Sequence, residues 1–441
     1  SSSVMQGDVF SLKEAQLKDV AATVFTGYEV VSGDVKIIKI LMDGQEASEA
    51  HAGDEAKVIL DASPFYAESG GQVGDTGAIN LCNGVFDVVD TQRSEKVFLH
   101  IGKVKEGVVR VFDSGKAKID IERRLSIARN HTATHLLQAA LRKVLGTHVQ
   151  QQGSWVGVDR LRFDFTHFKQ VSQQELDRVE EVVNGFVIQN RAVSKKEMSL
   201  EEARKEGALA FFAEKYEDNV RVISIDDISK EFCGGTHLDQ TGSIGLFRIL
   251  HESSVASGVR RIEATTGTSA YRAMKEDQDV LGAVAQSLKT PVDKITIELE
   301  KRLKDIKEME KQLAGQRLQA IAGSIDQIIC KADDIKGVRV IMEKIKDADM
   351  DLLRKAADLI KQKQPDVFIA LGSAGGENAN LIVATNVKSI DACAVVKQVA
   401  HEIGGSGGGR KDFAQAGGTK PEKIDAAFEK IKAILKDMIA Q

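Results

Sequence analysis

Four side chains of the types that bind transition metals occur as two local pairs in this chain of 441 residues. His131 and His135 are four residues apart in a segment with helical periodicity, so both imidazoles project from one face and could reach one ion. Cys233 and His237 follow much later, separated by two glycines and a threonine. Nitrogen and sulfur ligands in this combination form the tetrahedral set that Zn²⁺ prefers. The sequence therefore predicts one zinc ion per chain.

The ligand types leave the role of this zinc open. If all four residues close its coordination sphere, the metal is structural and ties the helix to the loop. If three residues hold it firmly, a water molecule or a substrate atom takes or displaces the fourth position, and the metal is functional. Thr132, Ala133 and Thr134 separate the two histidines, so the glutamate of zinc proteases is missing and peptide hydrolysis is disfavoured.

Two polar segments could recognise a small ligand. Residues 68–75 contain three glycines within five positions, which allow close approach of a ligand to the backbone, although a tight barrel turn explains the same pattern. The candidate binding residues in this segment are Ser69, Gly70, Gly71 and Gln72. Three glutamines at residues 150–152 offer neutral donors and acceptors, which suit a hydroxyl group better than a charge.

Basic residues gather locally although the whole chain carries a net charge of −5. Residues 116–169 have a local charge of +6, which could contact the phosphates of a nucleic acid or could be an ordinary solvated face. Residues 404–411 are glycine-rich and end in Arg410 and Lys411, so they could cradle a phosphate. They lack the Gly-Lys-Ser/Thr ending of a P-loop, so nucleotide hydrolysis is not implied.

The elements that must position these residues change in type along the chain. Short β-branched runs separated by Gly, Asp and Asn recur between residues 20 and 120, which predicts a small β-barrel or sandwich. Residues 121–145 have the apolar spacing of a helix, which would carry His131 and His135. Residues 147–267 mix strand-like runs with helical stretches, which favours an α+β domain with a mostly antiparallel sheet.

A long helix and a compact α/β unit follow. Apolar residues three and four apart after Pro291 predict one long amphipathic helix, whose stripe could pack against the same chain or form a dimer seam. Residues 338–441 alternate strands with helices. The predicted fold class is therefore multidomain α+β: an N-terminal β-barrel, an α+β domain, a long helical connector and a C-terminal compact α/β domain.

The composition is that of a globular protein, with 42% hydrophobic and 28% charged residues. No run approaches the roughly 20 apolar residues that a membrane helix needs, and the N-terminus has no secretory signal. The four cysteines are few and dispersed, which is typical of a reducing compartment. We therefore expect a cytoplasmic protein with no membrane partner.

Six motifs in combination resemble alanyl-tRNA synthetase downstream of its aminoacylation domain: residues 25–28, 64–72, 131–137, 160–165, 233–237 and 258–264. The glycine-rich tail resembles the C-terminal domain of that family, which DHH-type phosphoesterases share. The resemblance implies a barrel subdomain with the glycine-rich motif at 1–115 and a zinc-dependent editing domain at 116–267. It also implies a helical connector for dimerisation at 268–330 and a DHHA1-like tRNA-binding domain at 331–441.

The activity implied by the resemblance is hydrolytic editing, which removes serine or glycine from mischarged alanine tRNA. The C-terminal domain would bind the tRNA elbow, and the connector and C-terminal domain would support a homodimer. His131, His135, Cys233 and His237 match the zinc and editing motif of the family, and Gln151 falls where the family has a residue important for editing. The catalytic set implied is His131, His135, Gln151 and Cys233.

Discrimination must depend on a hydroxyl group, because serine exceeds alanine only by that group and a site that admits serine cannot exclude alanine by size. The candidates that could hydrogen-bond this hydroxyl are Thr132, Thr134, Gln151 and the turn from Ser69 to Gln72. The candidate tRNA contacts are Arg260, Arg261, Gly407, Gly408, Arg410 and Lys411.

Nothing in the sequence resembles the class II catalytic domain that binds ATP and alanine, so we expect no aminoacylation by this chain. We interpret it as a fragment of a synthetase rather than a free-standing editing protein. The alternative function is a non-enzymatic tRNA-binding and dimerisation module with a structural zinc. A DHH-type phosphoesterase is disfavoured, because no Asp-His-His triplet occurs.

Overall fold

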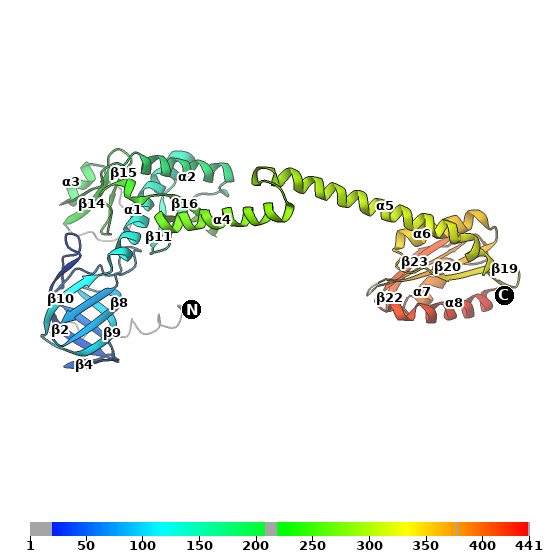
Figure 1. Ribbon diagram of the computed structural model, residues 1–441, viewed down its shortest axis with the longest axis horizontal. Helices are drawn as coiled ribbons and strands as arrows, with labels where there is room; N and C mark the ends of the chain where they lie inside the picture. Colours follow the sequence, from blue (N-terminus) through cyan, green and yellow to red (C-terminus); the bar gives the residue numbers. More distant parts are fainter. Residues whose placement is uncertain (1–19, 208–217, 376–377, 440–441) are drawn as a thin grey trace. The chain divides into compact units, whose positions relative to one another are not determined.

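The computed structural model describes residues 20–207, 218–375 and 378–439, which belong to two compact units, Ser1–Leu281 and Gly282–Gln441 (Figure 1). The first 19 residues of the stretch predicted as barrel lie outside the described residues. No helix in the described part of the chain is long and apolar enough to span a membrane.

A closed β-barrel forms the start of the first unit. Its six strands follow the order β10-β7-β8-β9-β5-β2, and pairing of β10 with β2 closes the ring. Ile37, Phe86 and Val104 are fully buried inside it, as the alternation of inward and outward residues requires. The strands up to the helix are β1 (Val24–Phe25), β2 (Ser32–Met42), β3 (Gln45–Ala47), β4 (Glu49–His51), β5 (Glu55–Leu60), β6 (Ala62–Ser63), β7 (Gly77–Leu81), β8 (Gly84–Ser94), β9 (Val97–Arg110) and β10 (Ser114–Ile119).

Two details of the barrel differ from the sequence-based expectation. Residues 97–99 and 108–112 read as two strands, but β9 runs unbroken from Val97 to Arg110. Gly102, in the middle of β9, lets the backbone of β9 approach the neighbouring strand β8 closely. A Cβ at this position would lie 1.9 Å from the Asp87 carbonyl oxygen. The boundary expected after residue 115 falls inside β10, whose pairing with both β2 and β7 extends the barrel to Ile119.

A buried histidine lies in the barrel core. His100 donates from Nδ1 to the Val58 carbonyl oxygen at 3.0 Å, which leaves Nε2 to accept from the Ser63 hydroxyl at 2.7 Å. Complete burial lowers the pKa of His100 to about 4, although the bond to Val58 acts in the opposite direction. The unprotonated imidazole is therefore the form that the folded barrel contains at neutral pH.

His100 should make the first unit sensitive to acid. Its folded pKa lies below the ordinary value of 6.5, so its contribution to stability is present above pH 6.5 and is lost as the pH falls toward 4. We expect this one group to lower the free energy of unfolding by about 3 kcal/mol between pH 7 and pH 4. Denaturant titrations of His100→Gln should show a flatter pH dependence than the wild type. The exposed His51, replaced in the same way, should leave the dependence unchanged; an unchanged slope in His100→Gln would refute the assignment.

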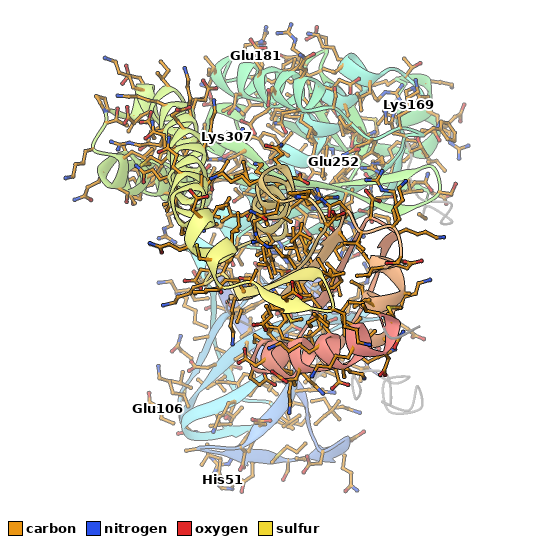
Figure 2. All side chains as sticks on the ribbon, turned by 90° about the vertical axis from the view of Figure 1, so that its right-hand side faces the viewer. His51, Glu106, Lys169, Glu181, Glu252 and Lys307 are labelled. Atoms are coloured by element: carbon orange, nitrogen blue, oxygen red, sulfur yellow. The ribbon has the colours of Figure 1, made fainter. Side chains whose placement is uncertain are left out.

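The second domain of the first unit follows at once. Asp120 caps helix α1 (Ile121–Leu145) by accepting from the Arg123 N–H, and Gly146 with φ of 118° ends it, so the predicted helix is confirmed. A four-stranded antiparallel sheet, β11-β12-β17-β16, packs with α1 and α2 around one core, and β13-β14-β15 form a second antiparallel sheet. The barrel carries His51 and Glu106, whereas Lys169, Glu181 and Glu252 belong to this second domain (Figure 2).

The elements of the second domain after α1 are β11 (Gln151–Val156), β12 (Leu161–Thr166), α2 (Gln173–Ile188), β13 (Ser194–Ser199), α3 (Leu200–Lys205), β14 (Asn219–Ile225), β15 (Ser229–Phe232), the 3₁₀ turn η3 (Thr241–Ile244), β16 (Phe247–Ala256) and β17 (Val259–Thr266). Helix α4 (Gly267–Leu288) follows, and the division between the two units falls within it.

The second unit is a six-stranded sheet between two helical layers. Its strand order is β18-β19-β20-β21-β23-β22, with α7 and α8 packed on one face and α6 and the end of α5 on the other. Its elements are η4 (Val292–Lys294), α5 (Ile295–Cys330), β18 (Asp333–Ile335), β19 (Val338–Lys344), α6 (Met350–Lys363), β20 (Val367–Gly375), β21 (Asn378–Thr385), α7 (Ala392–Val399), β22 (Gly405–Arg410), β23 (Phe413–Gly418), η5 (Pro421–Lys423) and α8 (Ile424–Met438). The long helix and the compact α/β domain are confirmed.

The glycine-rich segment is a strand rather than a phosphate-cradling loop. β22 forms the edge of the sheet and pairs with β23 in antiparallel register. A Cβ at Gly407 would lie 2.5 Å from a Val396 methyl group on α7, and a Cβ at Gly405 would lie 1.7 Å from the Gly417 carbonyl oxygen. Close packing therefore explains these glycines.

Candidate metal centre

The two metal-binding pairs meet in one cluster within the second domain. The ligand atoms of His131, His135, Cys233 and His237 all lie within 4.8 Å of one another. Helix α1 supplies the first two residues, and the loop after β15 supplies the other two. Cys233 Sγ lies 3.3 Å from His131 Nε2 and 3.2 Å from His237 Nε2. The three imidazoles are buried and the thiol is half-buried.

Each imidazole in the cluster is oriented through its Nδ1 atom. His131 Nδ1 lies 2.6 Å from Gln72 Oε1, and His135 Nδ1 hydrogen-bonds the Glu231 carboxylate. Amide and carboxylate oxygens only accept, so these two Nδ1 atoms carry the proton and Nε2 keeps its lone pair. His135 Nε2 is buried and has no hydrogen-bond partner in the described part of the chain. This donor set and tautomer fit Zn²⁺.

The third imidazole has a hydroxyl partner. His237 Nδ1 lies 3.3 Å from Thr132 Oγ1, which also accepts from the Leu238 N–H at 3.2 Å. Thr132 was a candidate for substrate binding, but its hydroxyl is already engaged beside a ligand. Thr134, another candidate, donates its hydroxyl to the Asn130 carbonyl oxygen one turn earlier in α1.

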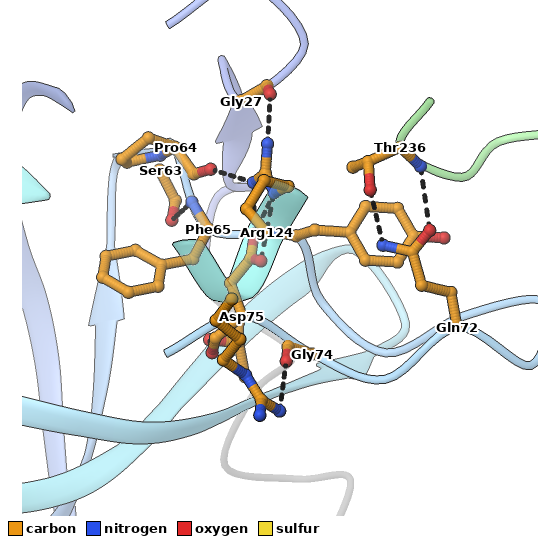
Figure 3. A network of polar contacts seen from close by, with 12 residues as sticks. Gly27, Ser63, Pro64, Phe65, Gln72, Gly74, Asp75, Arg124 and Thr236 are labelled. Atoms are coloured by element: carbon orange, nitrogen blue, oxygen red, sulfur yellow. Dashed lines mark hydrogen bonds and ion pairs between the residues drawn. The ribbon is translucent and has the colours of Figure 1, made fainter. Parts of the chain in front are cut away.

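Gln72 connects the barrel to the cluster. Its Oε1 accepts from the Thr236 N–H at 2.9 Å, and its Nε2 donates to Thr236 Oγ1 at 2.9 Å (Figure 3). A backbone N–H can only donate, so this contact fixes which end of the amide is oxygen and therefore the tautomer of His131. Gln72 was predicted to bind substrate; in the structure its fully buried amide orients a ligand.

The loop from Cys233 to Gly235 is held from outside the cluster. Arg221 donates to the carbonyl oxygens of Cys233 and Gly235 at 3.0 and 2.7 Å, and the Tyr28 hydroxyl donates to the Gly234 carbonyl oxygen. The Arg221 guanidinium also lies 4.0 Å from the centre of the Tyr28 ring. A Cβ at residue 235 would lie 2.0 Å from His131 Cε1, so only glycine fits there.

The electrostatics of the cluster favour a thiolate. Burial alone raises the pKa of the Cys233 thiol, but the neighbouring imidazoles of His131 and His237 lower it well below its ordinary value. Burial alone lowers the pKa of His135, but the Glu231 carboxylate and the Cys233 thiolate together outweigh burial and raise it to about 10. Binding of a metal at Nε2 would displace the proton that this nitrogen then carries. A thiolate is the form of cysteine that binds metal.

The other predicted substrate residues form a joint between the domains. Gly70 and Gly71 have φ values of 58° and 82°, which the turn from Ser69 to Gln72 requires. The Gly71 carbonyl oxygen accepts from the Val156 N–H at 2.7 Å, so the turn docks on β11. Gln151 begins β11, is half-buried, and makes no side-chain hydrogen bond to any described residue.

A buried ion pair forms a second joint. Arg124, at the start of α1, pairs with the Asp75 carboxylate of the barrel (Figure 3). It also donates to the carbonyl oxygens of Gly27 at 2.8 Å and Pro64 at 2.9 Å. Arg124 belongs to the basic stretch expected to meet phosphate, but the structure uses its charge within the core.

The candidate tRNA contacts differ in availability. Arg260 pairs with Glu252, which is labelled in Figure 2, and Arg261 contacts both carboxylate oxygens of Asp164 at 2.6 and 2.8 Å. A Cβ at Gly408 would meet open space. Within the described part of the chain, only the Asp412 carboxylate, 3.6 Å away, pairs with Arg410, whose side chain is 82% exposed. Arg410 is therefore freer to bind a phosphate than Arg260 and Arg261.

Glu231, Arg221 and Tyr28 support the cluster but were not among the predicted site residues. Glu231 stands two positions before Cys233, yet an acidic residue near a cysteine is too common to signal an imidazole partner. Tyr28 lies in one of the recognised motifs, but it contacts Gly234, which is 206 residues later in the sequence. These roles depend on tertiary contacts that no local pattern encodes.

Three family models match the chain. They are "tRNA synthetases class II (A)" at residues 2–123, "Threonyl and Alanyl tRNA synthetase second additional domain" at 220–263, and "DHHA1 domain" at 337–437. The first of these models is a class II synthetase model, but it matches the barrel segment, so the expectation that the chain lacks the domain that binds ATP and alanine stays a prediction. The described part of the first match folds as the barrel and the start of α1.

Curated relatives cover nearly the whole chain. The alanine–tRNA ligase of Acetivibrio thermocellus is 42% identical over 98% of this chain and 49% of its own length. The enzyme of Idiomarina loihiensis is 43% identical over 94% of this chain and 48% of its own length. Among solved structures, the C-Ala domain of Aquifex aeolicus alanyl-tRNA synthetase matches 25% of this chain and 99% of its own, with 24% identity and a TM-score of 0.23.

This chain thus spans about half the length of the curated relatives that it matches. The second additional domain match includes Cys233 and His237, and the DHHA1 match covers the sheet of the second unit. The chain therefore belongs to the alanine–tRNA ligase family and corresponds to the C-terminal part of its members.

Proposed function

We propose that this chain hydrolyses the ester bond of alanine tRNA mischarged with serine or glycine. The observation that carries the proposal is the buried cluster of three imidazoles and one thiol, with a hydrogen-bond partner on every Nδ1. Two of its residues, Cys233 and His237, lie in the match to the second additional domain of threonyl and alanyl tRNA synthetases. Such second partners orient ligands and strengthen metal binding. The residues that follow the barrel, 120–267, would be the editing domain.

His131, His135, Cys233 and His237 would hold Zn²⁺, which when bound would supply a Lewis acid for a carbonyl oxygen or an anchor for a substrate group. The protein itself offers donors nearby. Among the described residues, the backbone N–H groups of Gly234 and Gly235 have no acceptor, and they lie beside Cys233. They could stabilise the negative charge that develops on the ester oxygen. Gln151 would act on the aminoacyl end, as the family motif implies.

The second unit would bind the tRNA elbow through residues 331–441. The exposed Arg410 ends the edge strand β22, and Lys411 follows it; both could contact phosphates. Half-exposed apolar residues along α5 would form a homodimer seam: Leu299, Leu303, Ile306, Met309 and Leu313.

The test is the release of amino acid from alanine tRNA charged with serine, glycine or alanine. We expect release of serine and glycine, retention of alanine, and loss of release after zinc is removed with a chelator. Restoration by added zinc would separate metal loss from damage to the protein. Stable binding of the tRNA without release of serine or glycine would refute the hydrolase.

A structural zinc in a non-enzymatic tRNA-binding module is the second candidate. It is favoured by the number of protein ligands, because four close side chains form the closed set that is typical of structural sites. This candidate predicts salt-sensitive tRNA binding without hydrolysis.

A further inference from the structure

Gln138 on α1 has an unusual environment. Its side chain is 1% exposed, and both Oε1 and Nε2 are buried without a hydrogen-bond partner. Among the described residues, no other side chain has both a donor and an acceptor in this state. A buried amide without partners is costly, so native proteins normally pair it with a protein group, water or ligand.

Helix geometry puts Gln138 on the face of α1 that carries the metal ligands. Gln138 lies seven residues after His131 and three after His135, which puts it on the same face of α1. Long side chains on a helix lean toward its N-terminus, over the residues three and four positions earlier. For Gln138 those residues are His135 and Thr134, so the amide is directed toward the cluster.

Three other polar side chains near the cluster, those of Thr132, Thr134 and Gln72, are already engaged. Thr132 and Thr134 use their hydroxyls within the domain, and Gln72 uses both ends of its amide with His131 and Thr236. Gln138 retains one donor and one acceptor. A hydroxyl group also offers one donor and can accept, so a single serine hydroxyl could satisfy both ends of the amide. The methyl group of alanine could satisfy neither end.

We infer that Gln138 is a specificity-determining residue, which hydrogen-bonds the side-chain hydroxyl of the seryl group at the metal centre. This inference rests on the proposed editing function and names how that site separates serine from alanine. Glycine has no hydroxyl, so its release should not depend on Gln138.

The test replaces Gln138 with methionine, which keeps the length and approximate shape of the side chain but removes its hydrogen bonding. We expect kcat/KM for seryl-tRNA to fall about 10- to 100-fold, and that for glycyl-tRNA to change less than about 3-fold. Zinc content should remain at one per chain. Leu137→Met, at the adjacent and fully buried position, controls for disturbance of the core and should leave both rates unchanged.

The outcomes separate this inference from the function on which it rests. Release of both amino acids by the wild type, with an unchanged serine-to-glycine ratio in Gln138→Met, would overturn the inference alone. An equal loss of both activities would also overturn it, since it would indicate a general structural role. A wild-type chain that releases neither serine nor glycine would overturn the proposed function and this inference together.

Discussion

Replacing Cys233 with alanine should lower the rate of seryl-tRNA hydrolysis at least about 100-fold and leave the purified protein without its full zinc content. Cys233 supplies the only thiolate of the cluster, within 3.3 Å of two imidazole Nε2 atoms. Its removal leaves three neutral nitrogen ligands, which hold Zn²⁺ less tightly than a set with a negative sulfur. Metal analysis and a deacylation assay on the same preparation measure both effects.

Cys82 provides the matched control for Cys233, since it is exposed and lies in the barrel. Cys82→Ala should keep both zinc and hydrolysis. Unchanged hydrolysis with full zinc content in Cys233→Ala would show that the ligand assignment is wrong. Full activity after the metal has been lost would instead show that zinc is not needed for the reaction.

Replacing Asp75 with alanine should destabilise the first unit by about 3–5 kcal/mol. The change leaves the Arg124 guanidinium buried without its carboxylate, although its bonds to the Gly27 and Pro64 carbonyl oxygens remain. It also removes the acceptor of the Tyr66 N–H, 2.7 Å from Asp75 Oδ2. Trp155, the only tryptophan, lies in β11 beside the docked turn, so its fluorescence during urea unfolding reports on this unit.

The exposed pair of Arg178 and Glu181 is the control for the buried pair. Glu181→Ala should change the free energy of unfolding by less than about 1 kcal/mol, because solvent screens that pair. The double variant Arg124→Met with Asp75→Leu should recover part of the loss, since it removes the unpaired charge. Equal effects of Asp75→Ala and Glu181→Ala would refute the buried joint.

The sequence predicted elements best where one period dominates a long segment. The boundaries of α1 agree with the apolar spacing of residues 121–145, and Asp120 is its N-cap. The sequence does not predict β22, because glycine has low strand propensity. The packing of α7 against Gly407 explains why glycine occurs in this strand. Local patterns carry no information about such contacts between elements.

The metal-binding side chains were also predictable, because two His/Cys pairs are a specific signal even when they are far apart in the chain. Their supporting residues were not. The glycine-rich surroundings of Gln72 predict a ligand-binding residue, but the structure shows Gln72 as the partner of His131. No local pattern predicts roles for Glu231 and Gln138, because the role of an isolated Glu or Gln depends on the groups that it contacts in the folded chain.

Gln72 of the barrel contacts both His131 and Thr236 of the second domain, so metal binding and docking of the barrel on this domain are thermodynamically coupled. Any free energy by which the docked barrel tightens zinc binding must equal the free energy by which bound zinc tightens docking. Zinc should therefore protect the amide hydrogens at the contact of residues 69–73 with β11 against exchange, and chelation should loosen them. The barrel would then act as an allosteric partner of a metal to which it contributes no ligand.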